Sequence, residues 1–410
     1  MLRKMKLWRR AFALALISAL NPIAASYAGT FGSRTDCDNG ACDRIADYSG
    51  GNYSTSPRLF VEGSPSEIYS ERSAVGVQDG SANSPSGSAA APYSSGAQGG
   101  SGAGFNGAGS AAGGDGGFSG FSFAGSTPGS SFIAAAPGSY IDNAIVGNQF
   151  RFRFDSAYGN PTPDRAEFFY GQCGCFGGNA PGPLLPDTNV DYQEFRPYLE
   201  TALTRRLSLF VEAPIRLINP EVNPNAKGFS DLQVGFKRAL IQRNGTFLTA
   251  QLRMYTPTGD AREGLGTGHF SIEPGLLYLN RVSDRTTTQG EFQVWIPTSD
   301  STTQVGADTR NFAGTILRYG VGGGYDLLVA DTCCERRRLT GVLETVGWSV
   351  LDGLVLENGA AAPAQTTIVN VKSGLRYTAG NRSIAASYGR AVTGSVWYSD
   401  IMRLEYRYAF

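Results

Sequence analysis

The sequence ends in Met402-Arg-Leu-Glu-Tyr-Arg-Tyr-Ala-Phe410, a stretch in which apolar and polar side chains alternate. Successive side chains of a β-strand point to opposite faces of the sheet, so this stretch predicts a strand with one apolar face and one mostly charged face. A strand of this kind occurs in two classes of fold. One is a β-barrel that crosses a membrane, and the other is a soluble β-sandwich with an amphipathic edge strand.

The same alternation recurs from about residue 145 to the end of the chain. In 150–155, for example, three phenylalanines alternate with two arginines and an aspartate. Repeated period-two segments of about this length are typical of barrels. We predict about twelve strands, near residues 145–156, 191–204, 206–217, 229–241, 246–257, 269–281, 286–297, 312–328, 338–350, 365–378, 382–393 and 397–410.

The predicted connections alternate between short and long. The segments 204–206, 242–245, 282–285 and 379–382 have the composition of tight turns, whereas 159–190, 218–228, 258–268, 298–311 and 351–364 are long. An outer-membrane barrel has short periplasmic turns and longer extracellular loops. The sequence therefore favours an all-β, up-and-down antiparallel transmembrane barrel over a soluble sandwich. An even number of strands would put both barrel ends in the periplasm.

The N-terminal third has a different character. Residues 1–28 combine a basic head, a short apolar run and small residues before Gly29, which predicts a secretory signal peptide. Residues 84–129 consist almost entirely of Gly, Ser and Ala, and such a composition buries too little apolar surface to fold. We expect a disordered periplasmic tail over 29–140, followed by the barrel over 141–410, in the outer membrane of a Gram-negative-type cell.

The last strand resembles the C-terminal signal by which outer-membrane barrels are recognised. That resemblance implies two partners, the lipid of the outer membrane and the barrel-assembly machinery. The net charge of zero gives no indication of nucleic-acid binding, and we expect no cofactor. The residues that carry the signal are Met402, Leu404, Tyr406, Tyr408 and Phe410.

A second resemblance covers about residues 190 to 410. Gly228-Phe-Ser-Asp-Leu-Gln-Val-Gly-Phe-Lys237, Tyr255-Thr-Pro-Thr-Gly-Asp260, Gly264-Leu-Gly-Thr-Gly268, Glu273-Pro-Gly275 and Trp295-Ile-Pro297 occur in that order. Together they resemble the outer-membrane family named for the MetA pathway of phenol degradation, whose members are loosely called transporters. The resemblance implies a barrel fold and a small solute as cargo, with aromatic compounds as one candidate class.

The polar positions of the predicted strands would face the lumen. Their charges fit either a hydrated passage with a basic bias, suited to anions and polar solutes, or a filled barrel in which the charges pair. We therefore expect passive or facilitated passage of small solutes, with a non-conducting structural or surface-interaction barrel as the alternative. The lumen-facing candidates are Arg151, Arg153, Arg196, Glu212, Arg216, Lys237, Arg253, Glu273, Arg318, Lys372, Arg376, Arg403, Glu405 and Arg407.

An enzymatic function is a distant alternative. The only histidine, His269, precedes Ser271 on a predicted strand, as in the His-x-Ser pair of outer-membrane phospholipase. No Asn lies in 286–297, the adjacent strand, and both residues share the parity of Glu273, which predicts that they face the lumen and not lipid. Glu273 lies too far along the strand to orient His269 well. We therefore expect a non-enzymatic protein in which His269 is a polar residue at a strand end.

Six cysteines occur in three close pairs, Cys37 with Cys42, Cys173 with Cys175, and Cys333 with Cys334. In an exported chain an even number favours disulfides, and the spacing does not match a zinc site. The connectivity stays open. One hypothesis is a disulfide that links the tail to the barrel through Cys333 or Cys334. The glycines at 320, 322, 323 and 324 within one predicted strand indicate a bend or the close approach of another chain segment.

Overall fold

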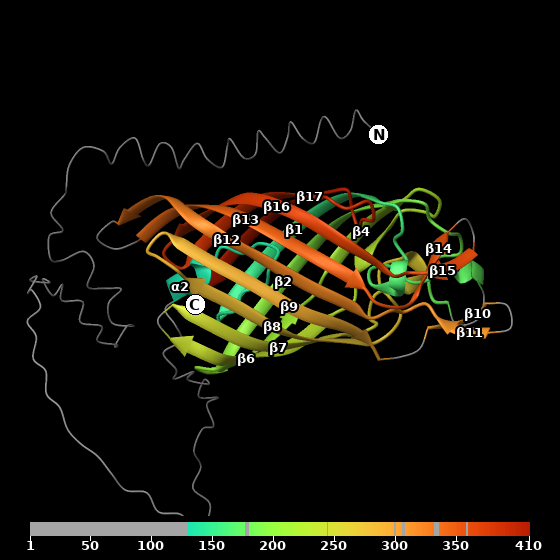
Figure 1. The fold of residues 1–410 in the computed structure, drawn as a ribbon, viewed down its shortest axis with the longest axis horizontal. Coiled ribbons are helices and arrows are strands. Elements are labelled where there is room, and N and C mark those ends of the chain that lie inside the picture. The colour runs from blue at the N-terminus through green and yellow to red at the C-terminus, as the bar shows by residue number, and fades with distance from the viewer. Residues whose placement is uncertain are drawn as a thin grey trace, which may run out of the picture. The chain divides into compact units, whose positions relative to one another are not determined.

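The computed structural model describes residues 130–176, 180–243, 245–298, 301–305, 308–331, 336–357 and 360–410 (Figure 1). Their main sheet closes on itself, because β1 (Gln149–Asn160) pairs with β18 (Asp400–Ala409) on one side and with β2 (Val190–Thr204) on the other. All pairings are antiparallel, and strands adjacent in the wall follow one another along the chain. The predicted twelve-stranded up-and-down barrel is confirmed.

One of the predicted strands that the structure alters is interrupted, and another begins later than expected. The strand expected over 206–217 is divided by Ala213 and Pro214, since proline has no N–H to donate to the sheet. The strand expected over 145–156 begins only at Gln149. The remaining wall elements are β3 (Leu207–Glu212) with β4 (Ile215–Pro220), β5 (Ala226–Phe229) with β6 (Gln233–Arg243), β7 (Thr246–Tyr255), β8 (Ser271–Arg281), β9 (Thr286–Pro297), β12 (Ile316–Asp331), β13 (Arg336–Val350), β16 (Thr366–Ala379) and β17 (Arg382–Ala391).

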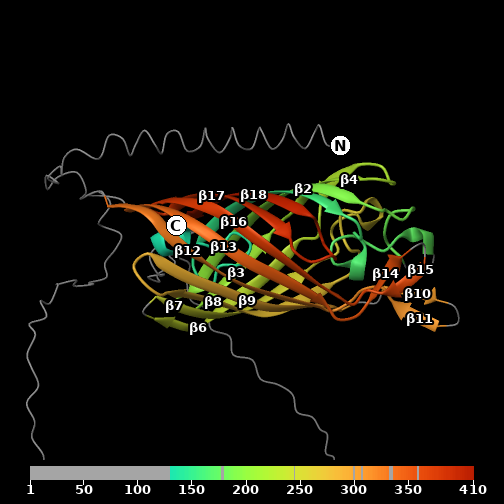
Figure 2. The same cartoon turned by 45° about the horizontal axis from the view of Figure 1, so that its top comes forward.

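The two ends of the barrel differ, as Figures 1 and 2 show. Short turns, the C-terminus and the start of β1 lie at one end, which we call the short-turn end. Long connections lie at the other, the long-loop end, and they contain secondary structure that the sequence did not indicate. These elements are η2 (Arg165–Glu167), η3 (Gly174–Phe176), η4 (Ala261–Glu263) and two hairpins, β10 (Thr302–Val305) with β11 (Asp308–Asn311) and β14 (Leu354–Glu357) with β15 (Ala360–Pro363).

The two faces of the wall have opposite chemistry. In β1 the apolar Phe152 is 39% exposed, whereas its neighbours Arg151 and Arg153 are 3% and 5% exposed. The same inversion holds on β9, where Phe292 is 52% exposed beside the buried Glu291. A soluble protein would bury the apolar face, so this wall has the surface of a barrel surrounded by lipid. Among the described residues, no helix is long and apolar enough to span a bilayer.

The interior of the barrel contains residues 130–148, which we call the inner segment. It begins with α2 (Ser130–Ala135) near the short-turn end (Figure 1), extends to Tyr140 and Asp142, and returns to β1. Ile133 and Tyr140 are only 1% and 4% exposed. Residues 130–140 fall in the region expected to be a tail, yet from Ile133 onward they pack inside the barrel, while Ser131 and Phe132 are exposed. The expected signal peptide and residues 29–129 of the tail lie outside the described residues.

Candidate functional site

The charged residues predicted to face the lumen lie in the barrel interior. Eleven have buried side chains and three, Arg196, Arg216 and Arg318, are half-buried. They do not line an empty passage, because many contact the inner segment and others pair with charged side chains on nearby strands of the wall. Glu212, for example, accepts hydrogen bonds from Arg151 (2.8 Å) and Arg196, which lie on two other strands.

One carboxylate of the wall binds backbone N–H groups of the inner segment. Glu344 on β13 accepts hydrogen bonds from the N–H groups of Ser139 (3.3 Å), Tyr140 (3.2 Å) and Ile141 (3.1 Å). Its side chain also accepts a bond from the hydroxyl of Ser139 (3.0 Å). A buried carboxylate that accepts several N–H groups replaces the bonds that water would supply to both partners.

Cationic side chains of the wall bind the carbonyl groups of the same segment. They come from strands around the whole barrel, so the segment is held from several sides. The tip of the inner segment, around Tyr140 and Asp142, also contributes a charge, since the carboxylate of Asp142 pairs with Arg253 (2.7 Å). The carbonyl contacts are Arg407 with Ile133 (3.0 Å) and Ala136 (3.2 Å), Arg376 with Gly138 (2.8 Å), Arg403 with Ser139, Arg318 with Tyr140 (3.0 Å) and Lys237 with Asn143 (3.1 Å).

Glycines of β12 provide the space that the inner segment occupies. A Cβ atom at Gly324 would lie 2.6 Å from Cβ of Pro137, and one at Gly320 would lie 3.1 Å from Ile141. The interpretation that a glycine here allows another chain segment to approach closely is confirmed for Gly320 and Gly324, whereas Gly322 and Gly323 face the adjacent strands of the wall.

A cavity of about 140 Å³ remains between the tip of the inner segment and the long-loop end, and we call it the outer chamber. Cations outnumber anions around it, and aromatic rings form most of the rest of its wall. The charged lining residues are Arg153, Arg196, Arg216, Arg253, Arg318, Lys372, Arg403, Asp142, Asp155 and Glu194; the aromatic ones are Tyr140, Phe168, Phe169, Tyr192, Tyr255, Trp348, Trp397 and Tyr398.

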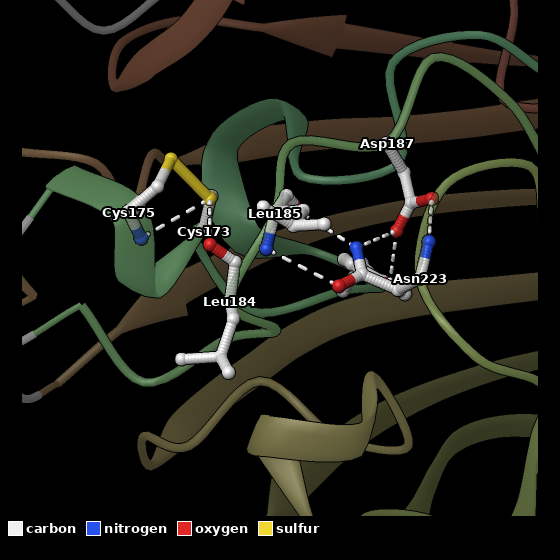
Figure 3. The surroundings of a disulfide bond; sticks show 7 residues. Cys173, Cys175, Leu184, Leu185, Asp187 and Asn223 are labelled. Atoms are coloured by element: carbon white, nitrogen blue, oxygen red, sulfur yellow. Dashed lines mark hydrogen bonds between the residues drawn. A yellow bond between two sulfur atoms is a disulfide. The ribbon is translucent and has the colours of Figure 1, made fainter.

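The long connection between β1 and β2 covers the chamber. Phe168 packs edge-on against Trp295 on β9, with ring centres 5.4 Å apart, and also contacts Trp397 (5.2 Å). Farther along, Asp187 accepts hydrogen bonds from the backbone and side chain of Asn223 (3.1 and 2.6 Å), as Figure 3 shows. These contacts attach the connection to the turn between β4 and β5.

Two buried acids lie in this connection. Burial raises the pKa of Asp164 to about 7, although Arg165 opposes the shift. Burial also raises the pKa of Glu167 to about 7, against hydrogen bonds from Ser301 and Gln172 that stabilise the charged form. Glu167 and its neighbour Ala166 adopt φ values of 52° and 55°, in the left-handed region that non-glycine residues rarely adopt.

Glu167 also lies beside the histidine considered as a catalytic candidate. The hydroxyl of Ser271 is 3.2 Å from Nδ1 of His269, and Nε2 of His269 is 3.6 Å from Oε2 of Glu167. Glu273 bonds instead to Arg253 and Tyr255. The third member of a Ser-His-acid arrangement thus comes from a distant loop, which strand spacing could not indicate. However, Ser271 and Glu167 are fully buried, and His269 is 4% exposed.

Of the candidate cysteines, Cys173 and Cys175 form a disulfide in the connection that covers the chamber (Figure 3). Cys37, Cys42, Cys333 and Cys334, and with them the proposed link between tail and barrel, lie outside the described residues. Within the part of the chain that the structure describes, no group of three or more His, Cys, Asp or Glu side chains is arranged to hold a metal ion.

The residues of the C-terminal signal lie on β18 and just after it. Leu404 and Phe410 are 38% and 50% exposed on the apolar outer face, and Met402, Tyr406 and Tyr408 are half-buried on the same face. Their role in assembly stays a prediction.

The sequence matches no protein-family model and no curated protein, so the resemblance to the MetA-pathway family is not confirmed. Solved structures with a similar fold include an outer-membrane channel from Pseudomonas putida F1, with 14% identity, 67% of this chain and 99% of that chain covered, and a TM-score of 0.41. The NanC porin has 9% identity, coverage of 63% and 98%, and a TM-score of 0.37. The β domain of the Bordetella autotransporter BrkA has 14% identity, coverage of 65% and 100%, and a TM-score of 0.39.

Proposed function

We propose that this protein is an outer-membrane channel through which small solutes pass when the inner segment leaves the lumen. The apolar outer face supports the membrane location, and the charged interior supports a path for polar solutes. The excess of cations around the outer chamber favours anions. In this proposal the short-turn end faces the periplasm, where the N-terminal residues and the barrel-assembly machinery are found.

The observation that carries the proposal is the polar attachment of the inner segment. From Gly138 to Asn143 its backbone is held by charged side chains of the wall, while the side chains of Tyr140 and Ile141 pack in a buried apolar cluster. Water can replace each of these hydrogen bonds once the segment moves, so their net contribution is far smaller than their number suggests. A segment attached in this way can leave while the wall stays intact.

The filled lumen also favours a second candidate function, a non-conducting structural barrel. In that protein the inner segment would be a permanent part of the core, comparable to the paired charges that fill small barrels. The apolar contacts near the short-turn end, where Ile133 packs with Phe247 and Leu279, support this alternative. The two functions differ in whether ions ever cross the lumen.

A disulfide between the inner segment and the wall would separate the two. The hydroxyls of Ser139 and Ser387 are 3.2 Å apart, so Ser139→Cys with Ser387→Cys can form a disulfide that fixes the segment. Single-channel recordings in planar bilayers should show discrete steps for the unmodified chain, loss of those steps in the oxidised double variant, and their return on reduction.

A matched control uses Ser349 and Thr367, whose hydroxyls are 3.1 Å apart on adjacent strands of the wall. Oxidation of the corresponding double cysteine variant should leave the conductance unchanged. If neither the unmodified chain nor the reduced variants conduct, although both migrate as folded, heat-modifiable barrels, the structural function is correct and the channel is not.

A further inference from the structure

The outer chamber contains two cations whose charge the protein leaves poorly compensated. Most of its other cations pair closely with an acid, as Arg403 does with Asp155 (2.6 Å) and Arg216 with Glu194 (2.6 Å). Arg153 and Lys372 do not. An uncompensated charge in a buried site is costly, and a bound anion removes that cost.

Arg153 on β1 is 5% exposed and lines the chamber. The nearest carboxylate oxygen recorded for it is Oε2 of Glu405, 3.6 Å from Nε, which is too far for a hydrogen bond. In the described part of the chain, its Nε and Nη2 atoms have no hydrogen-bond partner. Both atoms are enclosed by protein, and the nearest carboxylate compensates the guanidinium charge only at a distance, so an anion in the chamber can add to that compensation.

Lys372 on β16 is 2% exposed. Its Nζ atom donates to the hydroxyl of Tyr398 (2.9 Å) and lies 3.5 Å from the ring centre of Tyr140. Among the described residues it forms no ion pair with a carboxylate. The Arg403 guanidinium also lies over the ring of Tyr140, 3.8 Å from its centre, so positive charge gathers where the tip of the inner segment meets the chamber.

The remaining wall defines the rest of the ligand. Phe168, Trp348 and Trp397 present rings to the chamber, so an apolar group bound there is removed from water. The volume of about 140 Å³ is close to that of cavities which hold one benzene-sized molecule. A solute with two rings would not fit without movement of the covering connection.

We propose that the outer chamber is a binding site for a small organic carboxylate, with Arg153 and Lys372 facing the carboxylate and the aromatic wall contacting an apolar body of one ring or less. The site's role in passage rests on the proposed function. Its existence does not, because a ligand can bind whether or not the inner segment ever leaves.

Binding can be measured in detergent through tryptophan emission, since Trp348 and Trp397 line the chamber. Benzoate serves as the probe, and benzamide is its neutral counterpart of the same shape. We expect saturable binding of benzoate and at least tenfold weaker binding of benzamide. Acetate should bind more weakly than benzoate, because it lacks the apolar body, and chloride should not compete at equal concentration.

Substitutions of individual residues test whether Arg153 and Lys372 bind the carboxylate. Arg153→Gln and Lys372→Gln should each weaken benzoate binding at least tenfold, whereas Lys372→Arg should retain most of it. The matched control is Arg390→Gln, which removes a cation that is 70% exposed and does not line the chamber. It should change benzoate binding less than twofold. Heat-modifiable migration in gels verifies that each variant is folded.

Three results would overturn the inference: equal affinity for benzamide and benzoate, full competition by chloride, or an equal loss in Arg390→Gln. Conductance is recorded on the same preparations. Conductance without benzoate binding would leave the channel standing and reject the site. Benzoate binding without conductance would leave the site standing and reject passage.

Discussion

The carboxylate of Glu344 accepts a hydrogen bond from the backbone N–H of Tyr140 at 3.2 Å, two residues before Asp142 at the tip of the inner segment. The same side chain accepts a bond from Gln289 (2.8 Å) on the neighbouring part of the wall. One residue thus joins the strand that carries it, a second strand and the inner segment. This makes Glu344 the most direct point at which to weaken the attachment of the segment.

Glu344→Gln should release the inner segment more often. The amide keeps one acceptor oxygen but loses the charge, and its NH₂ group cannot accept the remaining backbone N–H groups. We expect a loss of about 2 kcal/mol in the attachment, which corresponds to a roughly 30-fold increase in the ratio of open to closed time. Single-channel recordings measure that ratio. The exposed Glu263 on η4 provides the control, and Glu263→Gln should gate as the unmodified chain does.

Gly324→Ala should displace the segment by a steric route. Its new methyl group would lie 2.6 Å from Cβ of Pro137, a distance that real Cβ contacts do not reach, so the segment or the strand must move. Such overpacking costs about 1–3 kcal/mol. We expect more frequent opening with little change in the melting of the barrel. At Gly341 a methyl group would meet only Leu327, at 3.5 Å, so equal gating of Gly341→Ala and Gly324→Ala would contradict this explanation.

Glu344 and Gly324 also show which parts of the structure the sequence could predict. Alternation of side chains located the wall strands to within a few residues, because a barrel face requires period-two patterning all along each strand. The inner segment has no such period, since it is neither a strand nor a long helix. Its position depends on bonds to side chains such as Glu344, which lies 203 to 205 residues away in sequence. The glycines of β12 were the one local sign that something packs against the wall.

The outer chamber shows the same limit. The sequence identified Arg153 and Lys372 as lumen-facing charges from strand parity alone. Parity could not tell which charges would find a partner, because that depends on the inner segment and on the connection that carries Phe168. The approach of Glu167 to His269 was unpredictable for the same reason: the two residues are far apart in sequence and meet only where that connection folds over the barrel.

Neither the unmodified chain nor Ser271→Ala should hydrolyse lipid faster than a control without protein. Although Ser271, His269 and Glu167 are arranged in a row, the serine is fully buried and faces the barrel interior, so a lipid ester in the bilayer cannot reach it. The assay uses phospholipid vesicles and a soluble nitrophenyl ester. Hydrolysis by the unmodified chain that disappears in Ser271→Ala, but persists when the turn residue Ser283 is changed to Ala, would establish an enzyme instead.

The covering connection should loosen as the pH rises from 6.5 to 8.5. Burial raises the pKa of both Asp164 and Glu167 to about 7, above the values that these acids have in an unfolded chain. Each therefore stabilises the packed connection at low pH, and that contribution is lost as the pH rises through about 7. For Glu167, whose ordinary pKa is 4.5, the total loss is roughly 3 kcal/mol; most of it occurs between pH 4.5 and 6.5, and roughly 1 kcal/mol remains to be lost between pH 6.5 and 8.5.

His269 acts in the opposite sense, because burial lowers its pKa below 6.5, so that its contribution is present above that value and lost as the pH falls. The acids alone therefore dominate between pH 6.5 and 8.5. Since Phe168 packs against Trp295 and Trp397, loosening should shift tryptophan emission to longer wavelength and increase conductance over this range. The double variant Asp164→Asn with Glu167→Gln, which keeps both side chains neutral, should show neither change. A shift of equal size in that variant would mean that other groups control the connection.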